Sequence, residues 1–549
     1  MDKKIIEFKE NNTPYSTEFG DIYFSVDDGM AETDHVFLKG NQLPHSWNGY
    51  KHIRICETGF GTGLNFFMAA SLFEKTKKEG QKLFYTAIEK HPLKQEDISK
   101  SLEKWRDHFG DVFDIFLSKY PIRISGFHPI IIKPDIILVL IFDDIKDALP
   151  EIADKQDFWF LDGFAPAQNP DMWQDALYQN MSRLSHNQTR FATFTAAGMV
   201  KRGLESAGFE IEKVNGFGRK RDMLVGQFKS DQQRPKEKDA RDEYKIAGAG
   251  LAGLTTGHLF TQLGAHIKIY DKNEHSAQNA SSNKIGLISP RIGAERIAAY
   301  EYYNAAFALF NRENKEQLNQ IGTLFEPDNE TKILRFEKFK NNMNWPSECV
   351  EYKDKNILFT DAGTASPANL CAHYAQNLDV QFGQEIKEAD IWATSYHQDF
   401  SAFDIQKIRG QVSYAIAKNH GLKHVHSYGA YVAPIDENHI SFGATFTHWD
   451  DSEGVTEKDN TYNLEKLKLK HDDIKIEDGW AAFRCASKDR LPIIGPYEGR
   501  YINIAHGSHG MISSLAAAFI LAYYEGLLPQ PFGKTVLEAV SPQRYTKDK

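Results

Sequence analysis

Short apolar runs that end at an acidic residue recur along the first part of this chain. HIRICE at 52–57 mixes apolar and polar positions, and the helix-like stretch LNFFMAASLFEK follows at 64–75. The runs KLFYTAIE at 82–89, IILVLIF at 136–142 and DFWFLD at 157–162 each end at or just before an acid. Because a Rossmann-like sheet binds ligands at the carboxyl ends of its strands, these acids indicate a nucleoside pocket.

A second pattern of this kind begins near the middle of the chain. YKIAGAG at 244–250 predicts a strand and a turn, LAGLTTGHLFTQLG predicts a helix, and HIKIYD at 266–271 predicts a strand that ends at an acid. The stretch between the two patterns, residues 229–243, contains no large apolar side chain and predicts an exposed linker. With 549 residues, the chain is long enough for two domains, at 1–228 and 244–549.

The turn after the first strand carries three alternating glycines. Gly59, Gly61 and Gly63 follow Glu57 with the spacing of an S-adenosylmethionine loop, and glycine lets the backbone turn tightly beside a ligand. Glu89 ends the next strand, where its carboxylate can accept hydrogen bonds from ribose hydroxyls. The first half is therefore predicted to be a Rossmann-like class I methyltransferase domain.

The second half carries a dinucleotide signature. Gly248, Gly250 and Gly253 lie between a strand and a helix, so pyrophosphate oxygens can accept hydrogen bonds at the helix N-terminus. Asp271 ends the following strand and suits a ribose hydroxyl. The pattern predicts a Rossmann-type α/β domain, although composition alone does not separate flavin from nicotinamide.

Composition and charge narrow the class of protein. Hydrophobic residues make up 41% of the chain, enough for two cores, and no apolar run approaches the length of a membrane span. The four cysteines are far apart in sequence and indicate neither a disulfide framework nor a metal site, so we expect a cytoplasmic protein without metal. A net charge of −10 argues against general nucleic-acid coating, but a basic loop of Arg219, Lys220 and Arg221 can contact a phosphate backbone.

The segment WFLDGFAPAQNPDMW holds the candidate for chemistry in the first half. Asp162 ends a strand, where a carboxylate can orient an acceptor amine and take up its proton during attack on a methyl sulfonium. Phe164 and Trp173 can offer flat surfaces on which an extruded base stacks, although core packing is the commoner use of such residues.

Five segments of the first half resemble one enzyme family. They are YFSVDDGMAETDHVFLKGN, ETGFGTGLNFF, FWFLDGFAPAQNPDMW, FTAAGMVKRGLESAGF and GFGRKRDM. These segments are similar to the methyltransferase half of the bifunctional tRNA 5-methylaminomethyl-2-thiouridine biosynthesis proteins. The resemblance implies methylation of an aminomethyl group on the tRNA wobble uridine by S-adenosylmethionine. It also implies that Glu57, Gly59, Phe60, Gly61 and Glu89 hold the methyl donor, that Asp144 lies near its adenine and that Asp162 faces the acceptor amine.

The second half resembles the oxidoreductase half of the same family, and more broadly the flavin enzymes that oxidise amino acids and secondary amines. The segments are NASSNKIGLISPR, KIRGQVS, YGAYVAPIDENHISFGAT, GWAAFRCASKDRLPIIGPY and INIAHGSHGMISSLAAAFILA. The resemblance implies FAD, an α+β substrate subdomain, and removal of the carboxymethyl group from 5-carboxymethylaminomethyluridine as glyoxylate. It places Arg484 on the substrate carboxylate, which a guanidinium binds with two parallel hydrogen bonds. It places Gly507, Ser508, Gly510 and Met511 beside the flavin.

This second half departs from the family pattern at Ser282, Ser395 and His509, and it is shorter before GTASPANL. Two other functions therefore stay open: a methyltransferase fused to an oxidase of a free small amine, and an oxidoreductase half that serves only to bind tRNA. No membrane, metal or obligate protein partner is expected in any of them.

Overall fold

The computed structural model describes residues 5–545 except 10–11, 26–27, 219, 239–240, 242, 397–399, 401, 449 and 471–472. The chain divides into two compact units. Unit 1 comprises Met1–Asp239 and Leu528–Lys534, and unit 2 comprises Ala240–Leu527 and Thr535–Lys549. Within the described residues, no helix combines the length and apolar character that a membrane crossing requires.

Unit 1 is built on an eight-stranded sheet in the order β10-β11-β9-β8-β4-β5-β7-β6. The strands are β4 (His52–Glu57), β5 (Lys82–Ile88), β6 (Gly126–Lys133), β7 (Ile136–Phe142), β8 (Gln156–Phe160), β9 (Ser185–Thr193), β10 (Phe209–Asn215) and β11 (Asp222–Phe228). The central strands β7, β5, β4, β8 and β9 run parallel. β7 is buried along its whole length, as its continuous apolar sequence requires of a strand that is covered on both faces.

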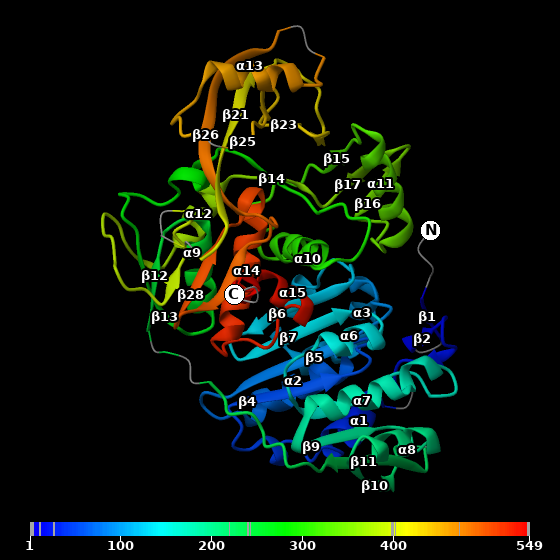
Figure 1. The fold of residues 1–549 in the computed structure, drawn as a ribbon. Helices are drawn as coiled ribbons and strands as arrows, with labels where there is room; N and C mark the ends of the chain where they lie inside the picture. Colours follow the sequence, from blue (N-terminus) through cyan, green and yellow to red (C-terminus); the bar gives the residue numbers. More distant parts are fainter. Residues whose placement is uncertain are drawn as a thin grey trace. The chain divides into compact units, whose positions relative to one another are not determined.

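Helices flank this sheet, as Figure 1 shows. They include α1 (Gly29–Thr33), α2 (Leu64–Thr76), α3 (Gln95–Leu102), α5 (Asp111–Ser118), α6 (Ile145–Glu151), α7 (Asp175–Leu184) and α8 (Gly198–Ser206). α2 follows β4 directly and buries Phe66, Phe67 and Phe73 in the core. Ahead of the sheet, the short strands β1 (Ile6–Phe8), β2 (Pro14–Ser16) and β3 (Asp21–Ile22) form a separate small sheet.

The stretch that the sequence predicts as an exposed linker is partly anchored to unit 1. Arg234 has 19% of its side chain exposed, and its guanidinium donates to both carboxylate oxygens of Asp157, which is 1% exposed. His186 also contacts this carboxylate, at 2.8 Å. The expectation overlooked these contacts because a segment without apolar residues can still be held by buried ion pairs.

Unit 1 also takes in a segment from near the end of the chain. Gln530 donates to the backbone oxygen of Glu151 at 2.7 Å and accepts from the backbone of Ala153, also at 2.7 Å. Leu528–Lys534 thus groups with unit 1, whereas the sequence assigns all of 244–549 to the second domain.

Unit 2 contains two large sheets and a small one formed by β14 (Gly286–Ile288) and β18 (Gly363–Ala365). The first has the order β19-β13-β12-β20-β28-β27, with β12 (Glu243–Ala247), β13 (His266–Tyr270), β19 (Asp379–Gln381), β20 (Ile391–Trp392), β27 (Ile493–Tyr497) and β28 (Arg500–Ile504). All its neighbouring strands pair in parallel except β27 with β28. The helices α9 (Leu251–Gln262) and α14 (Gly510–Tyr524) pack against each other, and α10 (Ala298–Glu313) packs on α14.

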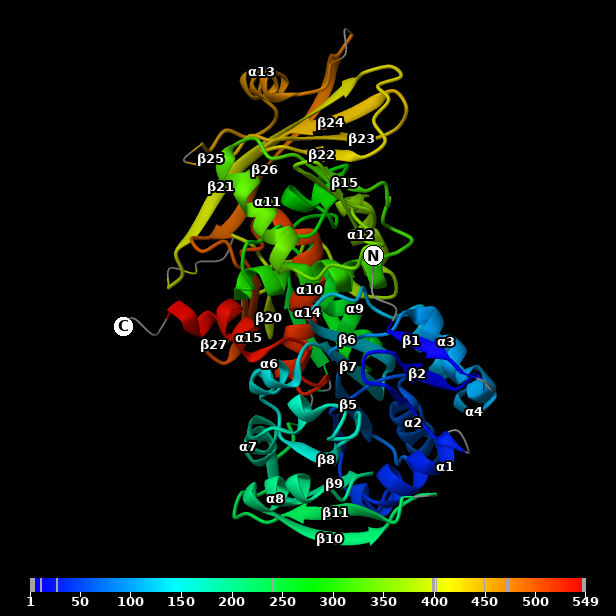
Figure 2. The ribbon, with the colours of Figure 1, turned by 90° about the vertical axis from the view of Figure 1, so that its right-hand side faces the viewer.

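The second sheet of unit 2 forms a separate layer (Figure 2). Its strands are β15 (Thr323–Phe325), β16 (Val350–Lys353), β17 (Asn356–Phe359), β21 (Ile405–Ile416), β22 (Val425–Ser427), β23 (Tyr431–Pro434), β24 (His439–Gly443), β25 (Thr447–His448) and β26 (Lys475–Ser487). The two long strands β21 and β26 pair antiparallel and place Ile408 opposite Arg484. Together with the Rossmann-type sheets, this layer confirms the predicted fold class.

Candidate functional site

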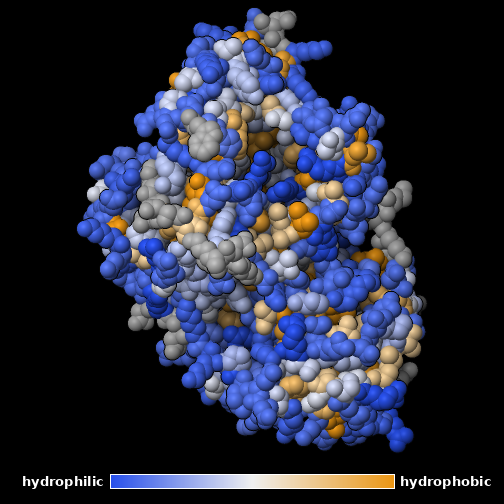
Figure 3. Space-filling model, viewed as in Figure 1, coloured by the Kyte–Doolittle hydropathy of each residue, from blue (hydrophilic) through white to orange (hydrophobic). Residues whose placement is uncertain are grey.

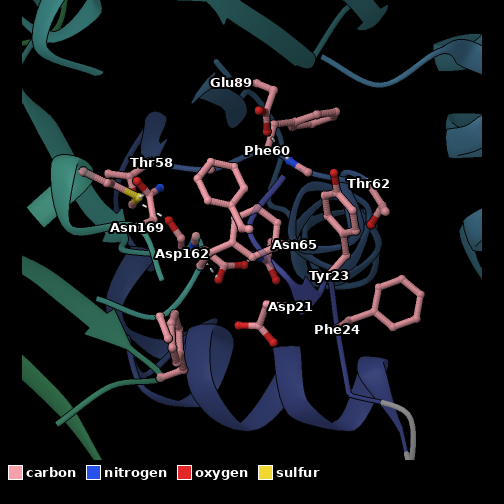
Figure 4. A pocket seen from close by; sticks show the side chains of 18 of the residues that line it. Asp21, Tyr23, Phe24, Thr58, Phe60, Thr62, Asn65, Glu89, Asp162 and Asn169 are labelled. Atoms are coloured by element: carbon pink, nitrogen blue, oxygen red, sulfur yellow. Dashed lines mark hydrogen bonds between the residues drawn. The ribbon is translucent and has the colours of Figure 1, made fainter. Parts of the chain in front are cut away.

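A cavity of about 580 Å³ lies at the carboxyl ends of the parallel strands of unit 1. Its volume is within the range that small-molecule sites occupy. The turn after β4, the residues after β5 and β7, and Asp162 after β8 all line it. Figure 4 shows side chains from these elements pointing into one space, with Glu89 at one end and Asp162 near the centre.

The glycine turn is shaped by its contacts. Gly61 and Gly63 have φ angles of 53° and 84°, in the left-handed region that favours glycine. A side chain at Gly59 would lie 3.0 Å from the backbone oxygen of Asp162, so this glycine lets the turn and the end of β8 approach closely. Gly63 does not line the cavity; a side chain there would lie 2.7 Å from the ring of Phe60, which does.

Glu89 and Asp144 are fixed on the cavity wall. Glu89 accepts from the backbone N–H of Gly61 and of His91, both at 2.8 Å, so its carboxylate is tied to the glycine turn. Asp144 contacts Lys90 at 2.9 Å. Burial opposes ionisation of Asp144, but hydrogen bonds from Lys90 and the backbone of Lys146 outweigh it and lower the pKa. Both acids are therefore placed to accept hydrogen bonds from a nucleoside.

Asp162 takes part in a short chain of hydrogen bonds that leads from the cavity into the core. Its Oδ1 accepts from the N–H of Gly163 at 2.8 Å, and its Oδ2 accepts from Asn65 Nδ2 at 2.6 Å. Asn65 also donates to Glu57 at 2.7 Å, and the Tyr85 hydroxyl donates to Glu57 at 3.0 Å. Burial raises the pKa of Asp162 to about 6, against the opposing effect of its two hydrogen bonds. A carboxylate with this pKa is ionised at neutral pH and can accept a proton.

Glu57 differs from the role that the resemblance implies. It is 0% exposed and does not line the cavity, because its side chain turns into the core toward Tyr85 and Asn65. Burial and the nearby charge of Asp162 raise its pKa well above the usual range. Glu57 accepts a hydrogen bond from Asn65, which also donates to Asp162, and Glu57 is not among the residues that line the cavity.

Aromatic rings line one wall of the cavity. Phe164 stacks on Phe19 with ring centroids 4.5 Å apart and meets the edge of Tyr23 at 5.4 Å. Trp173, by contrast, is 1% exposed, does not line the cavity and donates to the backbone oxygen of Phe164 at 3.3 Å. The expectation of a stacking surface at Trp173 is therefore wrong, because its ring completes the core beneath the loop that carries Phe164.

The three basic residues expected to contact phosphate differ in their surroundings. Arg219 lies outside the described residues. Lys220 lines the cavity, where it contacts Glu32 at 2.9 Å and lies over the Phe194 ring at 4.4 Å. Arg221 is exposed. Lys220 is therefore already paired with an acid. The run of three basic residues in the sequence does not indicate this pairing.

Sequence reasoning missed several residues of this cavity. Phe19, Asp21, Tyr23 and Glu32 come from the N-terminal segment ahead of the sheet, and Asn65 is on the first turn of α2. The signal that the sequence offered for Asn65 was its position as a polar residue in the apolar stretch LNFFMAAS. A buried amide requires hydrogen-bond partners.

In unit 2, the three glycines of the dinucleotide signature have separate physical roles. A side chain at Gly248 would lie 2.5 Å from the backbone oxygen of Ala393, and one at Gly253 would lie 1.8 Å from that of Gly248. Gly250 is different, because the nearest atom to a side chain there is Ser281 Oγ at 3.3 Å. The first two glycines are required by packing of the chain, whereas Gly250 leaves space open before the start of α9.

The starts of α9 and α14 lie close together. Thr255 and Ser514 occupy the same position in their helices, and the Thr255 hydroxyl donates to the backbone oxygen of Ser514 at 3.1 Å. Two adjacent helix N-termini favour negative charge. Asp271 accepts from the backbone N–H of Ala249 at 2.7 Å, so its carboxylate borders the same turn. This arrangement, with the space at Gly250, fits the pyrophosphate and ribose of a dinucleotide.

The turn before α14 holds the other residues expected beside the flavin. Gly507 has a φ angle of 56°, Ser508 is exposed and Gly510 begins α14. Met511 packs closely on Gly286 of β14 (Gly286–Ile288). A side chain at Gly286 would lie 2.4 Å from the methyl group of Met511. Gly507 and Ser508 belong to the short 3-10 helix Gly507–His509 that follows β28, and Gly510 and Met511 form the start of α14.

Arg484 and Arg409 lie on paired strands but have opposite surroundings. Arg409 is 1% exposed and donates to the backbone oxygens of Ser452 and Gly454 and to Asp459. Arg484 makes no hydrogen bond or ion pair with any residue that the structure describes; its guanidinium lies over Gly410 and 5.9 Å from the exposed ring of Phe446. Desolvation lowers its pKa. A desolvated guanidinium without an acid partner is suited to bind an anion.

The structure shows the local surroundings of the three departures from the family pattern. Ser282 accepts from the Trp480 indole at 2.9 Å. Ser395 has a φ angle of 58°, in the region that favours glycine. Desolvation, together with the charges of nearby arginines, lowers the pKa of His509 to about 4, so its imidazole is neutral at pH 7.

Comparison with known proteins finds matching families for both units. Residues 107–229 match the model of a family of S-adenosyl-L-methionine-dependent methyltransferases, residues 388–524 match FAD dependent oxidoreductases, and residues 246–312 match NAD(P)-binding Rossmann-like domains. These matches confirm the two predicted cofactors.

The chain is also similar to full-length proteins named tRNA 5-methylaminomethyl-2-thiouridine biosynthesis bifunctional protein MnmC. The Methylobacillus flagellatus protein is 30% identical over 97% of this chain and 94% of its own length. The Stutzerimonas stutzeri protein is 30% identical over 98% of this chain and 96% of its own length. Among solved structures, glycine oxidase from Geobacillus kaustophilus aligns with 55% of this chain and 98% of its own, with a TM-score of 0.47 and 15% identity.

Proposed function

This chain belongs to the family of bifunctional tRNA 5-methylaminomethyl-2-thiouridine biosynthesis proteins, and on that premise we propose that it catalyses two consecutive reactions on the wobble uridine of tRNA. Unit 2 oxidises the carbon–nitrogen bond of the 5-carboxymethylaminomethyl group, and hydrolysis of the resulting imine releases glyoxylate and leaves a 5-aminomethyl group. Unit 1 then methylates that amine. The product of the first reaction is the acceptor of the second, which accounts for the fusion of two enzymes in one chain.

The observation that carries the oxidative step is Arg484, which has no acid partner among the described residues. The carboxymethyl group ends in a carboxylate, and a desolvated guanidinium of this kind can bind it with two parallel hydrogen bonds. FAD, held by the turn at Gly250, by Asp271 and by the start of α14, would supply a two-electron acceptor. The neutral imidazole of His509 adds no further charge beside the substrate.

The methylation step depends on Asp162. S-adenosylmethionine would lie along the turn of Gly59 and Gly61, with Glu89 and Asp144 accepting hydrogen bonds from its nucleoside. An aminomethyl group is mostly protonated at neutral pH, and only its neutral form has a lone pair for attack on the methyl group. The carboxylate of Asp162, with a pKa of about 6, can attract this amine, orient it and receive its proton.

The acceptor is a base within an RNA, and the methyltransferase cavity has features that suit one. Phe164, Phe19 and Tyr23 offer aromatic faces beside Asp162, and base–aromatic stacking is how proteins commonly hold an unstacked nucleotide. Exposed Arg221 can contact a flanking phosphate. All four cysteines are free and buried, which suits the reducing cytoplasm where tRNA is modified.

A stoichiometric experiment tests this function. Purified full-length protein loaded with FAD is mixed with tRNA that carries the carboxymethylaminomethyl group, without S-adenosylmethionine, and glyoxylate is trapped as a hydrazone. One glyoxylate should form per aminomethyl uridine detected by mass spectrometry. Glyoxylate formation from free glycine, with the tRNA unchanged, would instead establish an oxidase of small amines.

A further inference from the structure

Two arginines of unit 2, Arg291 and Arg490, flank one buried tyrosine, and a third, Arg335, lies on a helix that contacts the segment after Arg291. Tyr303 on α10 is 1% exposed, and the guanidinium of Arg291 lies 5.5 Å from its ring. The Tyr303 hydroxyl donates to the backbone oxygen of Arg490 at 2.6 Å. Arg335 lies on α11 (Glu330–Asn342), whose Asn342 donates to the backbone of Ala294 in the segment that follows Arg291.

These arginines have no acidic partners among the residues that the structure describes. None of Arg291, Arg335 and Arg490 forms a side-chain hydrogen bond or an ion pair there, and the nearby carboxylate of Asp489 is taken by Arg544 at 2.8 Å. Arg335 and Arg490 are exposed, while Arg291 is half-buried. Desolvation and the positive charges of Arg335 and Arg490 lower the pKa of Arg291. Among the described residues, no acidic side chain pairs with these three arginines.

The cluster adjoins the site of the oxidative step. The imidazole of His509 packs on the Tyr303 ring with centroids 4.5 Å apart, and the charges of both Arg291 and Arg484 act on it. Figure 3 shows a hollow in this face of unit 2, between β15 and the long strands β21 and β26, where strongly hydrophilic residues lie beside hydrophobic ones. A substrate whose carboxylate is bound by Arg484 would thus extend past His509 toward the other arginines.

We propose that Arg291, Arg335 and Arg490 bind backbone phosphates of the anticodon loop next to the wobble nucleotide, and so make the oxidoreductase site selective for RNA. This inference rests on the proposed function. A single carboxylate satisfies Arg484 but leaves three further cations without an anion. In a tRNA substrate the groups that match them are the flanking phosphates, which arginine binds through two parallel hydrogen bonds. Such contacts position the RNA without reading its bases.

The test compares two substrates of the same full-length, FAD-loaded protein: the free nucleoside 5-carboxymethylaminomethyluridine and an anticodon stem-loop that contains it. The variant Arg335→Gln/Arg490→Gln should raise KM for the stem-loop by about threefold to thirtyfold, as the loss of two exposed ion pairs predicts. Its kcat/KM for the nucleoside should change less than about twofold, since both side chains lie outside the contact with the carboxylate. The slope of log kcat/KM against log salt for the stem-loop should become shallower by about 0.7 for each phosphate that the variant no longer neutralises.

The variant Lys332→Gln is the matched control, because Lys332 is a cation on the same helix as Arg335 that is already paired with Asp328 at 2.8 Å. This control variant should leave KM and kcat/KM unchanged for both substrates. An equal loss of activity on nucleoside and stem-loop in the arginine variant would show a structural effect and overturn the proposal. So would an unchanged KM and salt slope for the stem-loop. Failure of the wild-type protein to oxidise either substrate would count against the proposed function itself.

Discussion

Replacement of Asp162 by asparagine tests the chemistry of methyl transfer most sharply, because the structure fixes what the substitution removes. Each carboxylate oxygen accepts one hydrogen bond, from Gly163 and from Asn65. A carboxamide has one oxygen and one NH₂, so in either orientation its NH₂ faces a donor. Asn65 cannot turn its own amide to compensate without loss, because its Oδ1 accepts from Thr33 at 2.9 Å and its Nδ2 also serves Glu57.

Two magnitudes follow for Asp162→Asn. A buried hydrogen-bond donor that loses its acceptor costs about 1 to 3 kcal/mol, so the free energy of unfolding of unit 1 should fall by this amount. Loss of the proton acceptor should lower the rate of methyl transfer by about 10² to 10⁴, which corresponds to about 2.7 to 5.4 kcal/mol in the activation barrier. Binding of S-adenosylmethionine should persist, since Glu89 and Asp144 are unchanged.

The assay combines single-turnover methylation of tRNA carrying 5-aminomethyluridine with calorimetric binding of S-adenosylmethionine. The wild-type rate should fall as the pH decreases through about 6, because Asp162 must be ionised to receive the proton and burial has raised its pKa to that value. The variant should lack the inflection near pH 6 and keep only the pH dependence that protonation of the acceptor amine imposes.

Asp175→Asn makes the same chemical change at the exposed first residue of α7, outside the cavity, and should leave the rate and its pH profile intact. The reasoning about Asp162 is refuted if Asp162→Asn methylates at a near-normal rate. It is refuted equally if the variant loses donor binding in parallel with its fold, since Asp162 would then be structural.

Three further predictions concern other parts of the chain. Arg484→Ala should abolish glyoxylate release while methylation of tRNA that already carries the aminomethyl group continues; loss of both reactions would contradict independent sites. Gly250→Val should yield folded protein that binds no FAD, measured by absorbance after purification, because its side chain would fill the space before α9; retained yellow colour would contradict this placement of the cofactor. Arg234→Ala leaves the buried carboxylate of Asp157 with one partner fewer and should destabilise unit 1 by about 3 kcal/mol. S-adenosylmethionine binding should then be lost at a lower urea concentration while flavin release is unchanged, and an unchanged urea midpoint for S-adenosylmethionine binding would show that the ion pair is dispensable.

The regular elements of both halves could be predicted because their sequence patterns are local. The strand at 136–142 is a continuous apolar run, and the structure buries every one of its residues. Each glycine turn lies between a strand and a helix, so Gly61 and Gly250 could be placed at ligand-facing turns from spacing alone. Acids at strand ends followed from the same rule, and Asp162 and Glu89 do line the cavity.

The remaining features depend on contacts between distant segments. Tyr23 reaches the cavity from ahead of the sheet, which no local pattern indicates. Whether an aromatic residue of an irregular loop faces a ligand or the core depends on side-chain direction, and Trp173 faces the core. Glu57 ends its strand as expected, but its side chain points inward to a tyrosine. Arg234 lies in a polar stretch whose composition says nothing of the buried carboxylate it would meet.

The central claim is that one chain performs oxidation and then methylation on the same nucleotide. Mass spectrometry of wobble nucleosides tests it directly, with tRNA from cells that accumulate the carboxymethylaminomethyl form and purified protein supplied with FAD and S-adenosylmethionine. The carboxymethylaminomethyl nucleoside should disappear, the aminomethyl form should rise and decay, and the methylaminomethyl form should accumulate; without S-adenosylmethionine the sequence should stop at the aminomethyl form. Persistence of the carboxymethylaminomethyl nucleoside in the presence of both cofactors would contradict the account.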